Sequence, residues 1–230
     1  MELFNLNDMV EHPAILLLGK RRVGKSYLAK DIVYNEFYKN RKYKFYILIS
    51  PTAFLNDDYD FIPDEWKFEK FSTILLQKLF KRQDDLKKKY KNKGDFNTLL
   101  ILDDVVGLSN SEQSKLLATI LLSGRHRRIS IILSLQYLFT KEMSKSCRDC
   151  LDYGFIFPQS NTENIKAVVQ QWLGGSKEKE KEGYEIVKNI PDIKKHQILV
   201  IDNTQISAEN DNLYRYIADE IPKNALIKKQ

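Results

Sequence analysis

Residues 14–30 read AILLLGKRRVGKSYLAK, and this stretch decides how the rest of the chain is interpreted. A short apolar run, residues 15–18, leads into residues 19–26, GKRRVGKS, which fit the pattern G-x-x-x-x-G-K-[ST] at every fixed position. A helical pattern follows to about residue 40, with an apolar face formed by Leu28, Ile32, Val33 and Phe37. The sequence therefore predicts a buried strand, a phosphate-binding loop and a helix in direct succession.

Glycines in this loop let the backbone turn tightly and approach an anion, so that N–H groups and the helix N-terminus point at phosphate. We expect the loop and the residue after it to contact a nucleotide: Gly19, Lys20, Arg21, Arg22, Val23, Gly24, Lys25, Ser26 and Tyr27. Lys25 would reach the β- and γ-phosphates from a side chain that faces solvent when nucleotide is absent, and Ser26 would ligate Mg²⁺. A chance match at a strand-to-helix turn is the alternative, and the correct flanks on both sides argue against it.

The length of 230 residues predicts one α/β domain, with a motif-bearing core at about 14–157 and a C-terminal extension at about 158–230. A hydrophobic fraction of 43% suffices for a sizeable core, and the net charge of +6 permits a polyanionic partner without establishing one. No apolar run reaches the length of a membrane span, and the first residues lack a signal-peptide layout, so we expect a soluble protein in a reducing compartment. Cys147 and Cys150 lack the context of a zinc or redox site and are interpreted as ordinary thiols.

Apolar segments alternate with helical patterns along the chain. We expect strands at residues 44–50, 98–102, 129–135, 153–157 and 197–201, helices at about 73–92, 111–123, 162–172 and 177–189, and a short amphipathic helix at 211–221. This alternation predicts a mostly parallel sheet covered by helices. In such a sheet the carboxyl ends of the strands meet at one edge, where ligands bind.

Polar side chains close two of these strands. Asp103 would hold Mg²⁺ and Asp104 could take a proton from the attacking water, although paired acids can also cap a turn. Gln136 closes the run SIILSL and could orient the water or sense the γ-phosphate, whereas the alternative is a solvent-facing turn residue. The phosphate-binding loop upstream favours the functional interpretation of all three.

Arginines precede the strand that Gln136 closes. Arg125, Arg127 and Arg128 lie just before it, and one of them could neutralise charge that develops on phosphate, in cis or from a neighbouring subunit. We favour Arg125, while a DNA-backbone patch or plain surface stays open. The basic run at 86–95, LKKKYKNKGD, is typical of a solvated helix face and could also contact nucleic acid.

Residues 92–95, NKGD, match by letter the guanine-reading N-K-x-D of GTPases. In GTPases that motif follows a strand downstream of the acid that binds Mg²⁺, whereas here it lies upstream of Asp103. We therefore expect ATP rather than GTP.

The ordered set GKRRVGKS, ILISPTAF, LLILDDV, LLSGRHRRIS and ILSLQ resembles the viral genome-packaging ATPases of the FtsK–HerA superfamily, closest to the poxvirus-like type of large DNA viruses and virophages. The motifs span about residues 15–157. The resemblance implies a RecA-like P-loop NTPase fold and a homo-oligomeric ring, pentamer or hexamer, that drives double-stranded DNA into a capsid with ATP. It also implies capsid or vertex proteins as partners, DNA bound without sequence preference, and a location in the host cytoplasm (the virus factory) and in the virion.

The resemblance further implies roles for individual residues. Lys25 and Ser26 would contact nucleotide and metal, Asp103 would bind Mg²⁺, and Asp104 would be the base, with Gln136 as sensor and an arginine near 125 acting in trans. Relatives often carry glutamate where Asp104 stands, so the shorter acid must sit closer to the water. Many relatives also have R-x-N before the next strand, where this chain has Arg148-Asp149-Cys150.

Two other functions are compatible with a phosphate-binding loop. A small-molecule kinase would carry an arginine-bearing lid and an acceptor pocket, and no lid stands out in the sequence. An ATP-dependent assembly switch would bind nucleotide without moving DNA. Stimulation of ATP turnover by double-stranded DNA distinguishes a motor from both.

Overall fold

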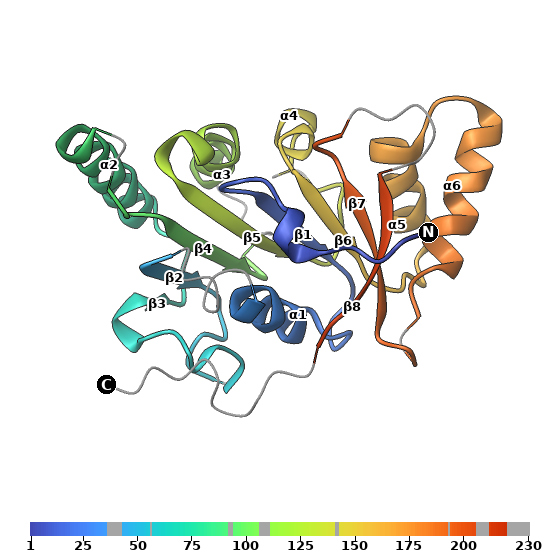
Figure 1. Ribbon diagram of the computed structural model, residues 1–230, viewed down its shortest axis with the longest axis horizontal. Coiled ribbons are helices and arrows are strands. Elements are labelled where there is room, and N and C mark those ends of the chain that lie inside the picture. The colour runs from blue at the N-terminus through green and yellow to red at the C-terminus, as the bar shows by residue number, and fades with distance from the viewer. Residues whose placement is uncertain are drawn as a thin grey trace.

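A computed structural model describes residues 1–35, 43–55, 57–91, 94–105, 111–140, 143–192, 194–205 and 212–219, except for the side chains of 111–113. Within these ranges one eight-stranded sheet runs through the molecule in the order β3-β2-β4-β5-β1-β6-β7-β8 (Figure 1). The predicted helix end near residue 40 and the first half of NKGD lie outside the described residues.

The strands are β1 (Ala14–Leu18), β2 (Phe45–Ile49), β3 (Lys67–Phe68), β4 (Thr98–Asp103), β5 (Ile129–Leu135), β6 (Tyr153–Ile156), β7 (Gln197–Asp202) and β8 (Leu213–Ile217). The helices are α1 (Lys25–Ile32), α2 (Thr73–Tyr90), α3 (Ser111–Ser123), α4 (Lys145–Asp149), α5 (Thr162–Val168) and α6 (Lys177–Asn189). Every predicted strand is confirmed to within one residue at either end. The predicted helix at 162–172 is α5 followed by a π-helical turn, Val169–Leu173.

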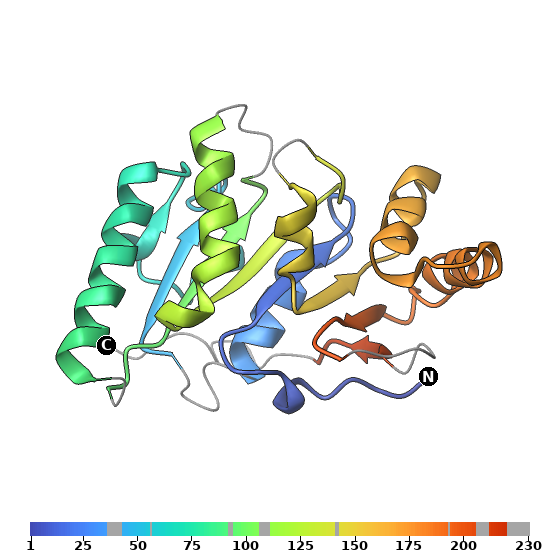
Figure 2. The ribbon, with the colours of Figure 1, turned by 90° about the horizontal axis from the view of Figure 1, so that it is seen from above.

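The strands from β3 to β6 in this order are parallel, whereas β7 and β8 are antiparallel to their neighbours. Leu16 and Leu18 of β1 pack in one apolar cluster together with α2, α3, α5 and α6, and Ile15 and Leu17 pack in a second cluster with α1. Figure 1 shows α2, α3 and α4 on one side of the sheet and α1 on the other, and Figure 2 shows α5 and α6 at one end. The apolar runs are continuous because both faces of each parallel strand are buried.

The N-terminal segment covers part of the second face. Phe4, Leu6 and Met9 are buried in the cluster that contains α1. The backbone N–H of Phe4 donates to the carbonyl of Arg215 at 2.8 Å, so this segment also borders the last strand of the sheet.

One predicted element is wrong. Residues 212–217 contain no helix, because β8 (Leu213–Ile217) pairs with β7 in register from Leu213 opposite Ile201 to Ile217 opposite Gln197. Apolar residues at 213, 216 and 217 have helical spacing. In the strand, Leu213 and Tyr216 are buried on opposite faces, whereas Ile217 is exposed. Tyr214 packs its ring 5.5 Å from that of Phe4, and aromatic residues favour strands.

No helix in the described ranges is both long enough and apolar enough to cross a membrane.

Candidate nucleotide-binding site

The phosphate-binding loop lies between β1 and α1, on a central strand of the sheet. The backbone N–H of Gly19 donates to the carbonyl of Leu135 at 3.0 Å, which ties the start of the loop to the end of β5. A Cβ at Gly19 would lie 2.7 Å from the Cβ of Phe157 and 2.8 Å from Cγ2 of Val23, so only glycine fits there. Gly24 has φ +99°, a left-handed conformation that glycine adopts freely, and it leaves the first N–H groups of α1 without a capping side chain. This cradle fits a phosphate group.

Lys25 lies within the loop and does not face solvent, which corrects the expectation from the sequence. Its side-chain Nζ donates to the carbonyls of Gly19 at 2.6 Å and Lys20 at 2.8 Å, and the residue is only 8% exposed. Burial lowers the pKa of Lys25, while the carboxylates of Asp104 and Asp103 act in the opposite direction. The loop carbonyls provide partners that a buried ammonium needs, and phosphate oxygens can replace them.

The two predicted acids lie at the end of β4, with different surroundings. Asp103 is the last residue of the strand, and burial raises its pKa. Asp104 follows with φ +51°, and this turn places its side chain at the surface. The sheet therefore gives Asp103 a half-buried position next to the loop and Asp104 an exposed position.

The sheet brings Gln136 against Asp104. Strand β5 lies between β1 and β4, so the residue that closes β5 sits between the phosphate-binding loop and the acids. The Gln136 Nε2 donates to Asp104 Oδ1 at 3.3 Å and lies 3.4 Å from Oδ2. A cavity of about 240 Å³ opens here, and its lining includes Arg21, Asp104, Gln136 and Thr140. A water molecule held in this cavity would have both an acceptor and an amide within reach.

Sequence reasoning missed Tyr59, which stands beside the predicted Mg²⁺ ligands. Its side chain is 2% exposed, and Asp103 and Ser26 are hydrogen-bonding neighbours of its phenol. The Lys30 Nζ donates to the carbonyl of Asp57 at 3.2 Å and thereby holds this segment against α1. No motif in the sequence indicates that a loop residue after the second strand returns to the site.

Sequence reasoning also missed two buried amides, Gln159 and Asn164, which are 8% and 4% exposed. Gln159 follows β6, and Asn164 lies in the first turn of α5. The Asn164 Nδ2 donates to Gln159 Oε1 at 3.0 Å and to the carbonyl of Gln136 at 2.8 Å. The rule that polar residues close strands at the ligand edge, which selected Asp103 and Gln136, would also have selected Gln159.

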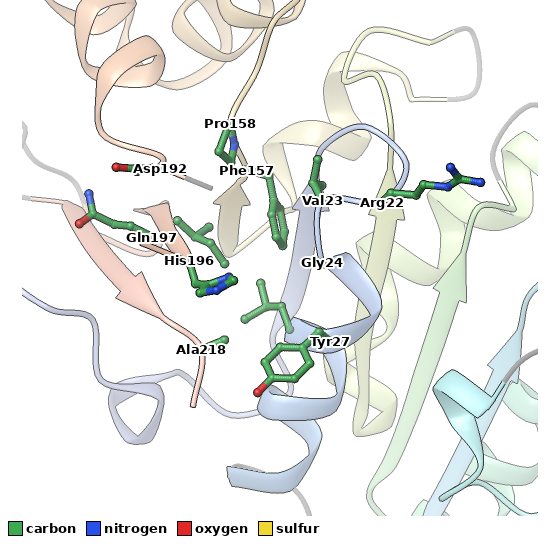
Figure 3. A pocket seen from close by; sticks show the side chains of 12 residues that line it. Arg22, Val23, Gly24, Tyr27, Phe157, Pro158, Asp192, His196, Gln197 and Ala218 are labelled. Carbon is green, nitrogen blue, oxygen red and sulfur yellow. The ribbon is translucent and has the colours of Figure 1, made fainter. Parts of the chain in front are cut away.

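A second cavity, of about 460 Å³, lies beside the loop (Figure 3). Its lining comes from the loop and α1 on one side and from the C-terminal strands on the other: Arg22, Val23, Gly24, Tyr27, Leu28, Phe157, Pro158, Asp192, His196, Gln197, Ile198 and Ala218. The rings of Tyr27, Phe157 and His196 border the same space in Figure 3. The Tyr27 hydroxyl donates to the carbonyl of Asp219 at 2.8 Å, which fixes that wall of the cavity.

The three arginines lie at the other edge of the sheet, because Arg125–Arg127 precede β5. Strand β5 has 7 residues, and a strand of that length spans roughly 20 Å. Arg127 donates through Nε to Asp84 Oδ1 at 2.9 Å, and Arg128 donates through Nη1 to the carbonyl of Gly94 at 2.6 Å. Arg125 is exposed, with Asp152 and Cys150 near its charge. The structure does not bring Arg125 to the nucleotide site of its own subunit.

The loop on β1, the acids on β4 and the glutamine between them define a P-loop NTPase. The chain belongs to the Poxvirus A32 protein family, whose model matches residues 1–229.

Relatives of the chain are found in viruses. It is 28% identical over 179 residues to the uncharacterized protein L437 of Acanthamoeba polyphaga mimivirus, which covers 74% of this chain and 61% of that protein. The chain thus spans less than two thirds of the length of that relative.

Solved structures share the fold. The DNA-packaging ATPase B204 of Sulfolobus turreted icosahedral virus matches with a TM-score of 0.60 at 18% identity, covering 92% of this chain and 100% of that one. The genome packaging NTPase B204 of Sulfolobus turreted icosahedral virus 2 in complex with AMPPCP matches with a TM-score of 0.58 at 18% identity, covering 90% and 98%.

Proposed function

We propose that this protein is an ATPase that moves double-stranded viral DNA into a capsid. The observation that supports hydrolysis most directly is the contact between Gln136 and Asp104 beside the phosphate-binding loop. An acid and an amide at this place can activate and orient a water molecule, which a protein that only binds nucleotide does not need. Membership of the Poxvirus A32 family and the packaging role named for B204 support the DNA substrate.

The residues next to the loop fit a magnesium ion. Ser26 and Asp103 offer a hydroxyl and a carboxylate oxygen, the hard donors that Mg²⁺ prefers, and both neighbour the same buried phenol. Bound Mg²⁺ would neutralise charge on the phosphates.

The remaining roles belong to the backbone and side chains of the chain itself. The N–H groups of α1 bind phosphate, and the Lys25 ammonium exchanges its carbonyl partners for phosphate oxygens. Asp104 accepts the proton of the attacking water, and the Gln136 amide holds that water in line. The alternative of a kinase is not favoured, because an acid and an amide in contact at this cavity suit the activation of water.

The cavity beside the loop suits the base and ribose of the nucleotide. It is walled by Val23 and Tyr27 on the loop side and by Phe157, Pro158 and His196 on the other. Aromatic and apolar walls next to a phosphate cradle favour a planar ring system. This cavity would accept either purine. We propose ATP as the nucleotide because the NKGD match does not have the placement of a guanine-reading motif and because B204 is described in complex with AMPPCP.

Arg125 is proposed to act on the nucleotide of a neighbouring subunit. Arg127 and Arg128 are engaged within their own subunit by Asp84 and Gly94, whereas Arg125 is exposed. Head-to-tail contacts of this kind generate rings when the rotation closes, and we propose such a ring around DNA. We propose capsid or vertex proteins as partners of this ring. We also propose that the protein is located in the virus factory and in the virion.

DNA-stimulated turnover tests the proposed function. Purified protein with ATP and Mg²⁺ should hydrolyse ATP faster when double-stranded DNA is added, and the stimulation should weaken with salt because binding depends on phosphate contacts. Lys25→Ala should abolish turnover, whereas Lys78→Ala, which removes an exposed lysine of α2, should not. Near-normal ATP turnover of Lys25→Ala would refute the assignment of the nucleotide-binding site. ATP turnover that does not change when DNA is added would favour an assembly switch.

Mixing two inactive variants tests the shared site. Arg125→Ala and Lys25→Ala should each be nearly inactive, since arginine fingers contribute roughly a thousandfold or more in rate. A mixed interface pairs an intact loop from the first variant with an intact arginine from the second, so activity should partly return. Absence of recovery, together with full activity of dilute monomeric wild-type protein, would exclude an arginine acting in trans.

A further inference from the structure

The hydrogen-bond ladder between β1 and β5 ends one residue before Gln136, the residue to which we assign the attacking water. The last register pair between β1 and β5 joins Leu18 to Leu135, and Gln136 lies one residue beyond it. Strand pairing with β1 therefore does not fix the backbone of Gln136. Its side-chain amide must nevertheless keep a defined distance from Asp104 for the proposed reaction.

A single side chain continues the ladder. Asn164 Nδ2 donates to the carbonyl of Gln136 at 2.8 Å, and Asn164 Oδ1 accepts from the backbone N–H of Leu138 at 3.3 Å. One amide thus binds the carbonyl before Tyr137 and the N–H after it, as an adjacent strand would. The residue is 4% exposed, so water does not compete for these bonds.

A second amide connects Asn164 to the start of the phosphate-binding loop. Gln159 Oε1 accepts from Asn164 Nδ2 at 3.0 Å, and Gln159 Nε2 donates to the carbonyls of Leu18 at 3.1 Å and Phe157 at 3.0 Å. Leu18 is the last residue before Gly19. The two amides, which we call the amide bridge, therefore join the ends of β1, β5 and β6 to α5.

We infer that the amide bridge, Gln159 and Asn164, positions Gln136 relative to the phosphate-binding loop and thereby sets the rate of hydrolysis. This inference rests on the proposed role of Gln136. The bridge residues do not touch the cavity between Gln136 and Asp104, so they are positioning residues and not catalytic ones. A displacement of about 1 Å in such a geometry can cost roughly a hundredfold in rate.

Asn164→Asp is the sharpest test, because it keeps the shape of the side chain and replaces the donor Nδ2 with an acceptor oxygen. The oxygen that replaces Nδ2 would face the carbonyl of Gln136 and Oε1 of Gln159, so the backbone of Gln136 should move away. We expect kcat to fall at least tenfold, while the dissociation constant of a non-hydrolysable ATP analogue changes less than threefold. Asn189→Asp is the matched control, since its Nδ2 donates to Glu185 on the exposed face of α6, and it should leave kcat unchanged.

A buried carboxylate can prevent folding, so a second variant is needed. Gln159→Met keeps the length of the side chain and removes its bonds to Leu18 and Asn164 without adding charge. It should also lower kcat at least fivefold with little change in analogue binding. Thermal unfolding measured on each variant identifies any that has not folded, and kcat of the folded variants then decides.

Combination with Gln136→Ala separates this inference from the proposed function. If the bridge acts through Gln136, then Asn164→Asp or Gln159→Met should change kcat less than twofold in the Gln136→Ala background. An equal loss in both backgrounds, or kcat within twofold of wild type in both folded bridge variants, would overturn the inference. Full turnover of Gln136→Ala alone would instead refute the proposed role of Gln136.

Discussion

Asp31 of α1 should make the stability of the protein fall as the pH rises. Its carboxylate is fully buried and accepts from the Tyr216 hydroxyl at 2.5 Å and from Asn35 Nδ2 at 2.6 Å. Burial raises the pKa of Asp31 from 3.8 to about 6, and the charge of Asp219 adds to the rise. The folded chain therefore holds this proton more tightly than the unfolded chain does.

The sign and size of the effect follow from that difference. Between about pH 4 and pH 6 the folded chain binds more protons at Asp31 than the unfolded chain, so the free energy of unfolding decreases across this window. Below the window the contribution is fully present, and above it the contribution is lost. A shift from 3.8 to about 6 corresponds to about 3 kcal/mol as an upper limit.

Urea unfolding of wild type and Asp31→Asn at pH 4.5, 6 and 7.5 measures this contribution. Asparagine cannot ionise, so the decrease in unfolding free energy from pH 4.5 to 7.5 should be smaller in the variant by about 1–3 kcal/mol. Asp85→Asn removes an exposed acid of α2 and should follow the wild-type pH dependence. If Asp31→Asn and wild type lose stability in parallel over this range, the proton is not held by Asp31 and the reasoning fails.

Four further variants test the nucleotide site. Gly19→Ala would place a Cβ 2.7 Å from the Cβ of Phe157, so we expect analogue binding to weaken at least tenfold, and an affinity near that of wild type would show that the loop can relax. Asp104→Asn should bind Mg-ATP normally and hydrolyse it at least a hundredfold more slowly. Asp103→Asn should instead weaken the Mg²⁺-dependent part of binding. Identical behaviour of these two variants would contradict the different roles of the two acids. Tyr59→Phe removes a hydroxyl beside Asp103 and should change the Mg²⁺ concentration needed for half-maximal analogue binding by at least threefold. An unchanged Mg²⁺ titration would argue against a link between the Tyr59 segment and the metal ligands.

The fold was largely predictable because its strands are buried on both faces. A continuous apolar run such as residues 14–18, between Pro13 and Gly19, favours a buried strand, and β1 (Ala14–Leu18) matches it at both ends. β8 (Leu213–Ile217) was not predictable in this way, since its pairing with β7 and the ring of Phe4 decide its conformation. In this outermost strand of the sheet, tertiary contacts override the preference indicated by the spacing of apolar residues.

The candidate site also contains residues that could be predicted from the sequence and residues that could not. The loop, Asp103, Asp104 and Gln136 follow from strand ends, since the topology of a parallel sheet gathers them at one edge. The burial of Lys25 could not be predicted, because it depends on carbonyls of a folded loop. Tyr59 and Asn164 reach the site from segments that carry no motif, and only their packing reveals them.

The placement of the nucleotide loop and Arg125 at opposite edges of the sheet has a consequence for counting active sites. Under the proposed head-to-tail arrangement, one subunit alone contains no complete site, and an open row of subunits contains one site fewer than its members. Only closure supplies the missing site, so the last subunit to join adds two. Such an enzyme would remain idle while its subunits are dispersed and would reach full activity only when the circle is complete.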